Sequence, residues 1–232
     1  MRVAIMQPYF LPYIGYFQLI AAVDKFVVYD NVKYTKKGWI NRNRMLLNGR
    51  EDTFSLAIRN APDSLNVCER EISPEFDREK LLRRLAGAYR RAPHYAIVFP
   101  TIEEIICCGE SNLFNYLFQS IVKLSRYLQL KTEFEISSDI PIDHTLTGQD
   151  KVLAICNFAH AKTYVNPTGG VDLYSRTAFA NCGVELKFLR SLLMEYKQFD
   201  STFVPWLSIV DVLMFNSADA VNELLRTKYE LH

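Results

Sequence analysis

The opening stretch MRVAIMQPYFLPYIGYFQLIAAVDKFVVYD, residues 1–30, decides the fold class. A short apolar run at residues 3–6 is typical of a buried parallel strand. Two prolines and a glycine then interrupt regular structure, and residues 16–23 have the apolar spacing of a helix. A second apolar run, rich in β-branched and aromatic residues, occupies residues 26–29. Strand, loop, helix and strand within about thirty residues predict a βαβ unit with parallel strands.

The same alternation continues to the end of the chain. The dipeptide Asn48-Gly49 favours positive φ and predicts a hairpin between residues 45–47 and 53–58. Pro93 and Pro100 punctuate the middle of the chain. Further helices are expected at residues 77–89, 111–128, 150–158 and 175–181, strands at 132–136, 163–166 and 184–189, and a largely helical tail at 204–225. We therefore expect one α/β domain over residues 1–232, with a Rossmann-like parallel sheet and a helical insertion at about 75–130.

Composition limits the class of protein. Hydrophobic residues make up 49% and charged residues 23% of the 232 residues, which excludes a disordered chain. The net charge of +1 gives no general attraction to nucleic acid or anionic lipid. Five cysteines without a CxxC spacing, and four histidines, predict neither a disulfide framework nor structural zinc but buried free thiols. No apolar stretch is long enough to span a bilayer, and the N-terminus does not resemble a signal peptide, so we expect a soluble cytoplasmic protein.

The loop after the first strand is the strongest candidate site, because parallel sheets bind ligands beyond the carboxyl ends of their strands. A helix that begins near Gly15 would direct free backbone N–H groups at a bound phosphate. Gln7 places an amide directly at the strand end. In the alternative interpretation the loop is only a tight turn, and Tyr9, Tyr13 and Tyr16 are core aromatics.

The second candidate is the basic and aromatic loop KYTKKGWINRNRM, residues 33–45. Arginine and lysine bind phosphate, and an aromatic face suits a sugar ring or base. A solvated basic loop is the alternative interpretation, and the neutral net charge makes nucleic acid a weaker one. The binding candidates here are Tyr34, Lys36, Trp39, Asn41, Arg42 and Arg44, joined by Asp30 after the second strand.

Two further segments carry candidates. In NPTGGVDLY, residues 166–174, adjacent glycines allow a backbone to approach a ligand closely, although a ligand-free turn is equally compatible. Its binding candidates are Asn166, Gly169, Gly170 and Tyr174. Asp211 lies in an apolar helical run and needs a partner, so a structural brace is the preferred role over a wall of the site.

No catalytic triad is readable from the spacing of serine, cysteine and histidine. By residue type the catalytic candidates are Gln7, Tyr16, Asp211 and His144, which lies in a loop and is a general base by chemistry. No metal site is predicted; Asp30, Asp172 and Asp211 are the carboxylates that leave the question of a divalent ion open.

The first βαβ unit resembles the nucleotidylyltransferase and class I synthetase superfamily, in which a His-x-Gly-His motif follows the first strand. The matching residues here are Tyr13, Ile14, Gly15 and Tyr16. Tyrosine donates one hydrogen bond but carries no positive charge, so the resemblance extends to the layout of the fold and argues against adenylyl transfer.

Four segments together resemble the WbqC-like family: MQPYFLPYIGYFQLI at 6–20, residues 23–45, YVNPTGGVDLY at 164–174, and YKQFDSTFVPWLSIVDVLMFN at 196–216. The resemblance covers essentially the whole chain. It implies a role in bacterial surface polysaccharide pathways, such as O-antigen, lipopolysaccharide or capsule biosynthesis, with aminoacyl or acyl transfer to a nucleotide-linked amino sugar as the reaction.

The leading hypothesis is thus a transferase or ATP-dependent ligase that modifies a nucleotide-linked sugar, with ATP or another nucleotide as the candidate cofactor. A nucleotidylyltransferase acting on a sugar phosphate and a non-catalytic binding or scaffold protein of the same fold are the alternatives. A homodimer is left open.

Overall fold

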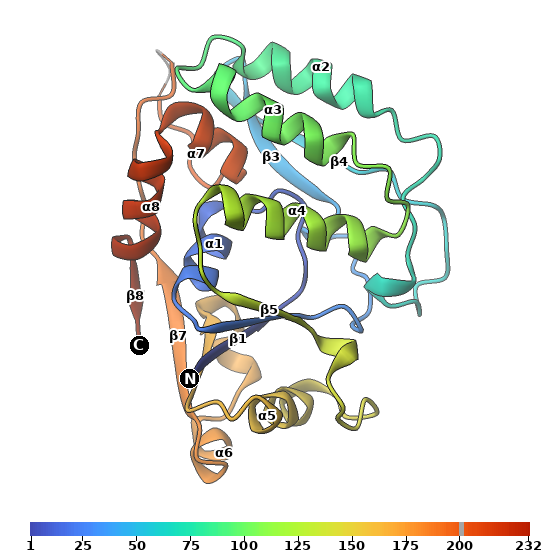
Figure 1. Ribbon diagram of the computed structural model, residues 1–232, viewed down its shortest axis with the longest axis vertical. Coiled ribbons are helices and arrows are strands. Elements are labelled where there is room, and N and C mark those ends of the chain that lie inside the picture. The colour runs from blue at the N-terminus through green and yellow to red at the C-terminus, as the bar shows by residue number, and fades with distance from the viewer. Residues whose placement is uncertain (200–201) are drawn as a thin grey trace.

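The computed structural model describes residues 1–199 and 202–232 and is built around one six-stranded sheet (Figure 1). The strands lie in the order β5-β2-β1-β6-β7-β8, and all are parallel except β8, which is antiparallel to β7. The molecule is therefore an α/β protein with a mostly parallel central sheet. The strand bounds are Arg2–Met6 for β1, Lys25–Val28 for β2, Glu133–Ile136 for β5, Thr163–Pro167 for β6, Glu185–Ser191 for β7 and Tyr229–Leu231 for β8.

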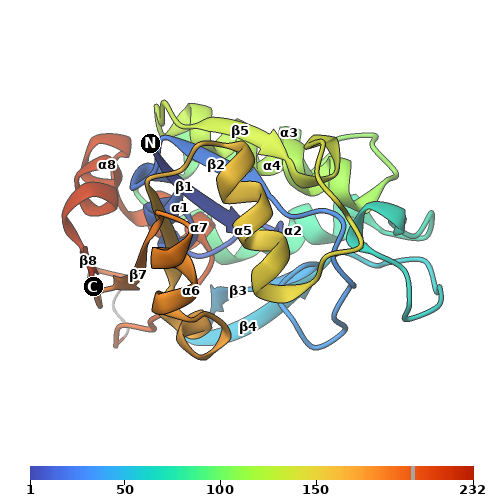
Figure 2. The ribbon, with the colours of Figure 1, turned by 90° about the horizontal axis from the view of Figure 1, so that it is seen from below.

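The opening βαβ unit is confirmed. β1 and β2 are parallel neighbours, and α1 (Ile14–Ala21) connects them. Successive side chains of β1 enter different cores, because Val3 belongs to one buried cluster and Ala4 to the other. Helices α5 (Gly148–Phe158) and α6 (Arg176–Asn181) cover the first of these faces, as Figure 2 shows. Both faces of the sheet are thus buried, which explains the continuous apolar run of its first strand.

A long connection joins β2 to β5. It contains the hairpin β3–β4, a 3-10 turn η1, and three helices stacked above the sheet (Figure 1). The predicted turn is confirmed, since Asn48 and Gly49 have φ values of 52° and 75°. The bounds are Arg42–Leu47 for β3, Arg50–Ser55 for β4, Val67–Glu69 for η1, Arg78–Tyr89 for α2, Tyr95–Ile106 for α3 and Leu113–Tyr127 for α4.

One expectation about regular structure is wrong. Pro100 lies inside α3 without ending it, because Val98, Ile102 and Ile105 on the same helix are buried and their packing outweighs one lost hydrogen bond. The tail is largely helical, as expected. It forms two helices, α7 (Ile209–Phe215) and α8 (Ala218–Thr227), each with a serine at its N-cap, and β8 follows.

The five cysteines are free, but only Cys156 is buried, and Cys107 and Cys182 are exposed. The expectation of uniformly buried thiols is therefore wrong. Among the described residues, no helix combines the length and apolar composition needed to cross a bilayer.

Candidate functional site: a crevice and an aromatic cup

An open crevice of about 440 Å³ lies at the carboxyl edge of the sheet. It lies where β1 and β6 are neighbours while their chains continue to opposite sides, which is the position where open parallel sheets bind ligands. Six residues predicted from two separate segments are brought together here: Gln7, Tyr9, Asn166, Gly169, Gly170 and Tyr174. The crevice also contacts Ile5, Met6, Tyr29, Val32, Gly148, Val152, Pro167 and Leu173.

The wall that follows β6 depends on a glycine. Asn166 is 6% exposed; it accepts a hydrogen bond from the Tyr164 hydroxyl at 3.1 Å and donates to the carbonyl of Pro167 at 3.0 Å. A Cβ on Gly170 would lie 2.1 Å from the amide nitrogen of Asn166, whereas a Cβ on Gly169 would meet nothing within 4 Å. Gly170 therefore makes room for Asn166, and Gly169 leaves backbone open to the crevice.

The loop at residues 7–13 is held rigidly although no regular structure supports it. Leu11 has φ of 43°, a conformation that costs a non-glycine residue about 1–2 kcal/mol. The Ser208 hydroxyl donates to the carbonyl of Leu11 at 2.6 Å, and the Asn43 amide donates to the carbonyl of Phe10 at 3.1 Å. Strain maintained by tertiary contacts of this kind is characteristic of binding sites.

The structure corrects the expectation that α1 begins as an open phosphate seat. Gly15 is buried, and a Cβ there would lie 2.3 Å from the ring of Tyr13, so this ring covers the start of the helix. Tyr16 is only 3% exposed, and its hydroxyl donates to the carbonyl of Gln7 at 3.0 Å. Gly15 and Tyr16 thus shape the loop by packing and do not line the crevice.

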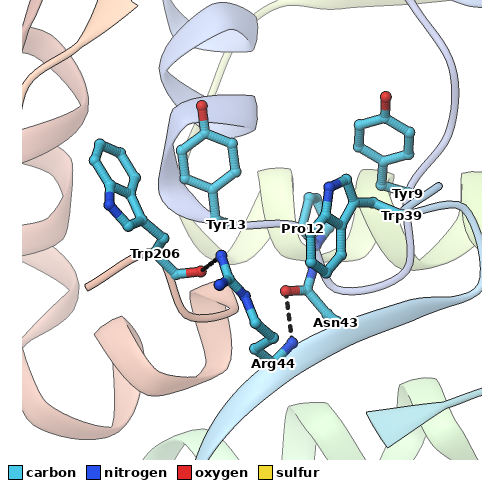
Figure 3. A pocket seen from close by; sticks show the side chains of 7 residues that line it. All are labelled: Tyr9, Pro12, Tyr13, Trp39, Asn43, Arg44 and Trp206. Carbon is cyan, nitrogen blue, oxygen red and sulfur yellow. Dashed lines mark hydrogen bonds between the residues drawn. The ribbon is translucent and has the colours of Figure 1, made fainter. Parts of the chain in front are cut away.

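An aromatic cup of about 210 Å³ adjoins the crevice, and Tyr9 lines both (Figure 3). The two tryptophans of the chain, Trp39 and Trp206, both line the cup and are 40% and 46% exposed. Exposed tryptophans gathered with tyrosines around one hollow are typical of a ligand surface. The complete lining is Tyr9, Pro12, Tyr13, Trp39, Asn43, Arg44 and Trp206.

Arg44 supplies the positive charge of the cup. Its guanidinium lies 5.0 Å from the centroid of the Trp39 ring, donates to the carbonyl of Trp206 at 3.0 Å, and pairs with Glu51 at 2.9 Å. Its Nε is buried without a hydrogen-bond partner in the described residues. Trp206 has φ of 60°, so the segment that positions this ring is strained.

The other candidates of the basic loop line neither cavity and bond to other groups of the protein. Lys36 forms an exposed ion pair with Asp63 at 2.7 Å. Arg42 donates to the carbonyls of Gly38 and Lys37, at 3.0 and 2.6 Å. In the same loop the Tyr34 hydroxyl donates to Asn41 at 2.9 Å.

His144 and Asp30 are both engaged in hydrogen bonds. The two ring nitrogens of His144 lie 3.0 Å from the Asn31 amide and 3.0 Å from the carbonyl of Ile140, so both are engaged within the protein. Asp30 is 2% exposed and accepts hydrogen bonds from the Ser137 hydroxyl and the Ser138 amide.

Asp211 is fully buried and lines neither cavity. It accepts hydrogen bonds from the hydroxyls of Tyr89 and Tyr196 at 2.9 and 2.6 Å and from the Gln198 amide at 2.7 Å. Burial raises the pKa of Asp211, and these three donors partly offset that rise. Its position is that of a structural brace.

Two of the three phenols of the crevice, those of Tyr9 and Tyr29, are firmly protonated at physiological pH. Burial, with the neighbouring Tyr13, raises the pKa of Tyr9 to about 12. Burial, with the charges of Tyr174 and Asp30, raises the pKa of Tyr29 to about 12. In residues 1–199 and 202–232 no three histidine, cysteine or acidic side chains gather as metal ligands.

Sequence reasoning missed Trp206, Asn43, Tyr29 and Gly148. A tryptophan directly after Pro205 was the available signal for Trp206. The other three enter the site through contacts between distant segments, which leave no local pattern.

The fold and the two cavities define the class: an α/β protein that offers a ligand crevice at the carboxyl edge of a mostly parallel sheet. The chain belongs to the WbqC-like protein family, whose model matches residues 7–223.

One relative is the uncharacterized protein Rv1507c of Mycobacterium tuberculosis, which is 26% identical over 226 residues, covering 96% of this chain and 97% of that protein. No solved structure matches significantly.

Proposed function

We propose that the protein is a transferase or ATP-dependent ligase that modifies a nucleotide-linked sugar, in the assembly of a bacterial surface polysaccharide such as O-antigen or capsule. The observation that carries the proposal is the pairing of the crevice and the aromatic cup through Tyr9. A nucleotide-linked sugar likewise has distinct parts that two adjoining cavities could bind separately: an anionic diphosphate, a planar base and a sugar ring.

The chemistry of the two cavities supports different parts of such a ligand. The cup offers the faces of Trp39 and Trp206 for stacking and Arg44 for a negative charge. The crevice offers the amide of Gln7, for which the described residues provide no side-chain hydrogen bond, and the open backbone at Gly169. The reacting group of the ligand would then lie near Tyr9, between the two.

Calorimetric titration with UDP-N-acetylglucosamine and with ATP tests the proposal. Trp39→Ala should weaken the binding of the bound nucleotide by about 1–3 kcal/mol, or roughly 5- to 150-fold, because a stacking face is lost. The matched control is Ile97→Ala, which removes another exposed apolar side chain, 68% exposed, on α3. The free energy of unfolding of both variants should lie within about 1 kcal/mol of the wild-type value.

The outcome that overturns the proposal is a folded protein that binds neither ligand, or that binds them equally well without Trp39. Binding without turnover of any sugar substrate would instead support the non-catalytic binding protein.

A further inference from the structure

The crevice has a neighbouring cation that the sequence analysis did not single out. Lys151 lies in the first turn of α5 and is only 4% exposed. Within the described residues its ammonium forms neither an ion pair nor a hydrogen bond, and lies 5.2 Å from the centroid of the Tyr29 ring, which lines the crevice. Lysine is almost never buried in this way without an ion-pairing carboxylate, whereas the contact of the Lys151 ammonium here is the face of the Tyr29 ring.

The surroundings of Lys151 do not satisfy its charge. The nearest carboxylate that influences it is Asp30, which already accepts hydrogen bonds from Ser137 and Ser138 and is not within ion-pairing distance. Burial lowers the pKa of Lys151, and the charges of Asp30 and Cys68 oppose that effect. Asp150, in the same turn, is exposed. A largely buried lysine without a carboxylate at ion-pairing distance can accept an additional anion.

The start of α5 provides a second attraction for that anion. The helix has eleven residues and begins at Gly148, which lines the crevice. Its N-cap residue Thr147 makes no side-chain capping bond, and a Cβ on Gly148 would meet nothing within 4 Å. Free N–H groups and the positive end of the helix dipole therefore lie at the crevice. α1 differs, because Tyr13 covers its start.

We propose that Lys151 and the first turn of α5 hold the diphosphate of the ligand in the crevice, so that the ligand is a nucleoside diphosphate derivative. The nucleoside part of this inference rests on the proposed function, whereas the anion site itself should bind inorganic pyrophosphate. Tyr29 lines the crevice beside the ammonium, and its protonated hydroxyl is an additional donor to the anion.

The test is the affinity of the full-length protein for pyrophosphate, UDP and uridine by calorimetric titration. Lys151→Met should weaken pyrophosphate and UDP binding by roughly tenfold to a hundredfold, because a charged hydrogen bond is lost, and should leave uridine binding unchanged. Its melting temperature should not fall, since methionine keeps the apolar stem and removes a buried charge. Lys162→Met is the matched control, because it removes the same charge from an exposed position beside the first residue of β6.

A second pair of variants keeps the test decisive if Lys151→Met does not fold. Gly148 is exposed and has φ of 54°, which asparagine and aspartate tolerate best among residues with side chains. Gly148→Asp should weaken pyrophosphate binding by repulsion, whereas the neutral Gly148→Asn should retain it. Aspartate also suits the positive end of a helix, so the loss would not reflect unfolding.

The inference is overturned if the wild type does not bind pyrophosphate, or if neither Lys151→Met nor Gly148→Asp weakens it. A protein that binds UDP-N-acetylglucosamine independently of Lys151 retains the proposed function without this anion site. A protein that binds pyrophosphate through Lys151 but no nucleotide retains the anion site without the proposed function.

Discussion

The buried carboxylate of Asp211 should be the most sensitive position for stability outside the apolar core. It connects three parts of the fold: α7, where it lies; Tyr89 at the end of α2; and the segment of Tyr196 and Gln198, which leads to the cup. Tyr89 extends the network, because its hydroxyl also accepts a hydrogen bond from the backbone of Leu46 at 2.9 Å.

The expected cost of Asp211→Ala follows from the groups it leaves unpaired. The hydroxyls of Tyr89 and Tyr196 each lose their acceptor, at about 1–3 kcal/mol for each buried donor. The Gln198 amide still donates to the carbonyl of Val204 at 3.1 Å, so the loss of its bond to Asp211 costs little free energy. Removing a buried charge offsets part of the total. We expect a net loss of about 3 kcal/mol, or roughly 6–12 °C for a chain of this size.

Urea unfolding, followed by circular dichroism, measures this loss directly. Asp172→Ala is the matched control, because it removes an exposed carboxylate and should change the free energy of unfolding by less than about 0.5 kcal/mol. A value for Asp211→Ala within about 1 kcal/mol of wild type would refute the assignment of Asp211 as a brace. The variant should also loosen the Trp206 segment and weaken ligand binding at the cup.

Three further outcomes are expected. Burial raises the pKa of Asp211, so its contribution to stability is complete below the unfolded pKa of about 3.9 and is lost as pH rises through the folded pKa. The difference between the unfolding free energies of wild type and Asp211→Asn should therefore fall when urea titrations are repeated upward from pH 4. A rise in this difference would contradict the prediction. Gly170→Ala should lose about 1–3 kcal/mol in the same assay through its clash with Asn166, whereas Gly169→Ala should be nearly neutral; equal effects would disprove the packing argument. Tyr9→Phe should weaken nucleotide binding without changing how the binding affinity depends on pH between 6 and 9, since the pKa of Tyr9 is raised to about 12. A pH dependence of the calorimetric affinity that is present in wild type and lost in Tyr9→Phe would count against this.

Local patterns were sufficient for most of the fold. The apolar runs predicted β1 and β2 as parallel strands, and Asn48-Gly49 predicted the β3–β4 hairpin, because each depends on residues adjacent in the chain. Tertiary packing decided the rest. The buried face of α3 overrides Pro100, and β8 is a strand because β7 offers it an edge, which no three-residue pattern announces.

The site was predictable in part for the same reason. A strand end followed by a polar loop is a local signal, and it identified Gln7, Tyr9 and Asn166, which the crevice brings together. Charge alone was a weaker guide. Of the basic residues at 33–45, Arg44 lines the cup, whereas Lys36 pairs with Asp63 and Arg42 donates to a backbone carbonyl of its own loop.

A crystal structure grown with UDP-N-acetylglucosamine tests the central claim most directly. The account predicts difference density that runs continuously from the crevice beside Gly148 to the cup between Trp39 and Trp206, with Tyr9 in contact with both halves of the ligand. Density confined to another surface, with both cavities unchanged and Tyr9 untouched, would contradict it.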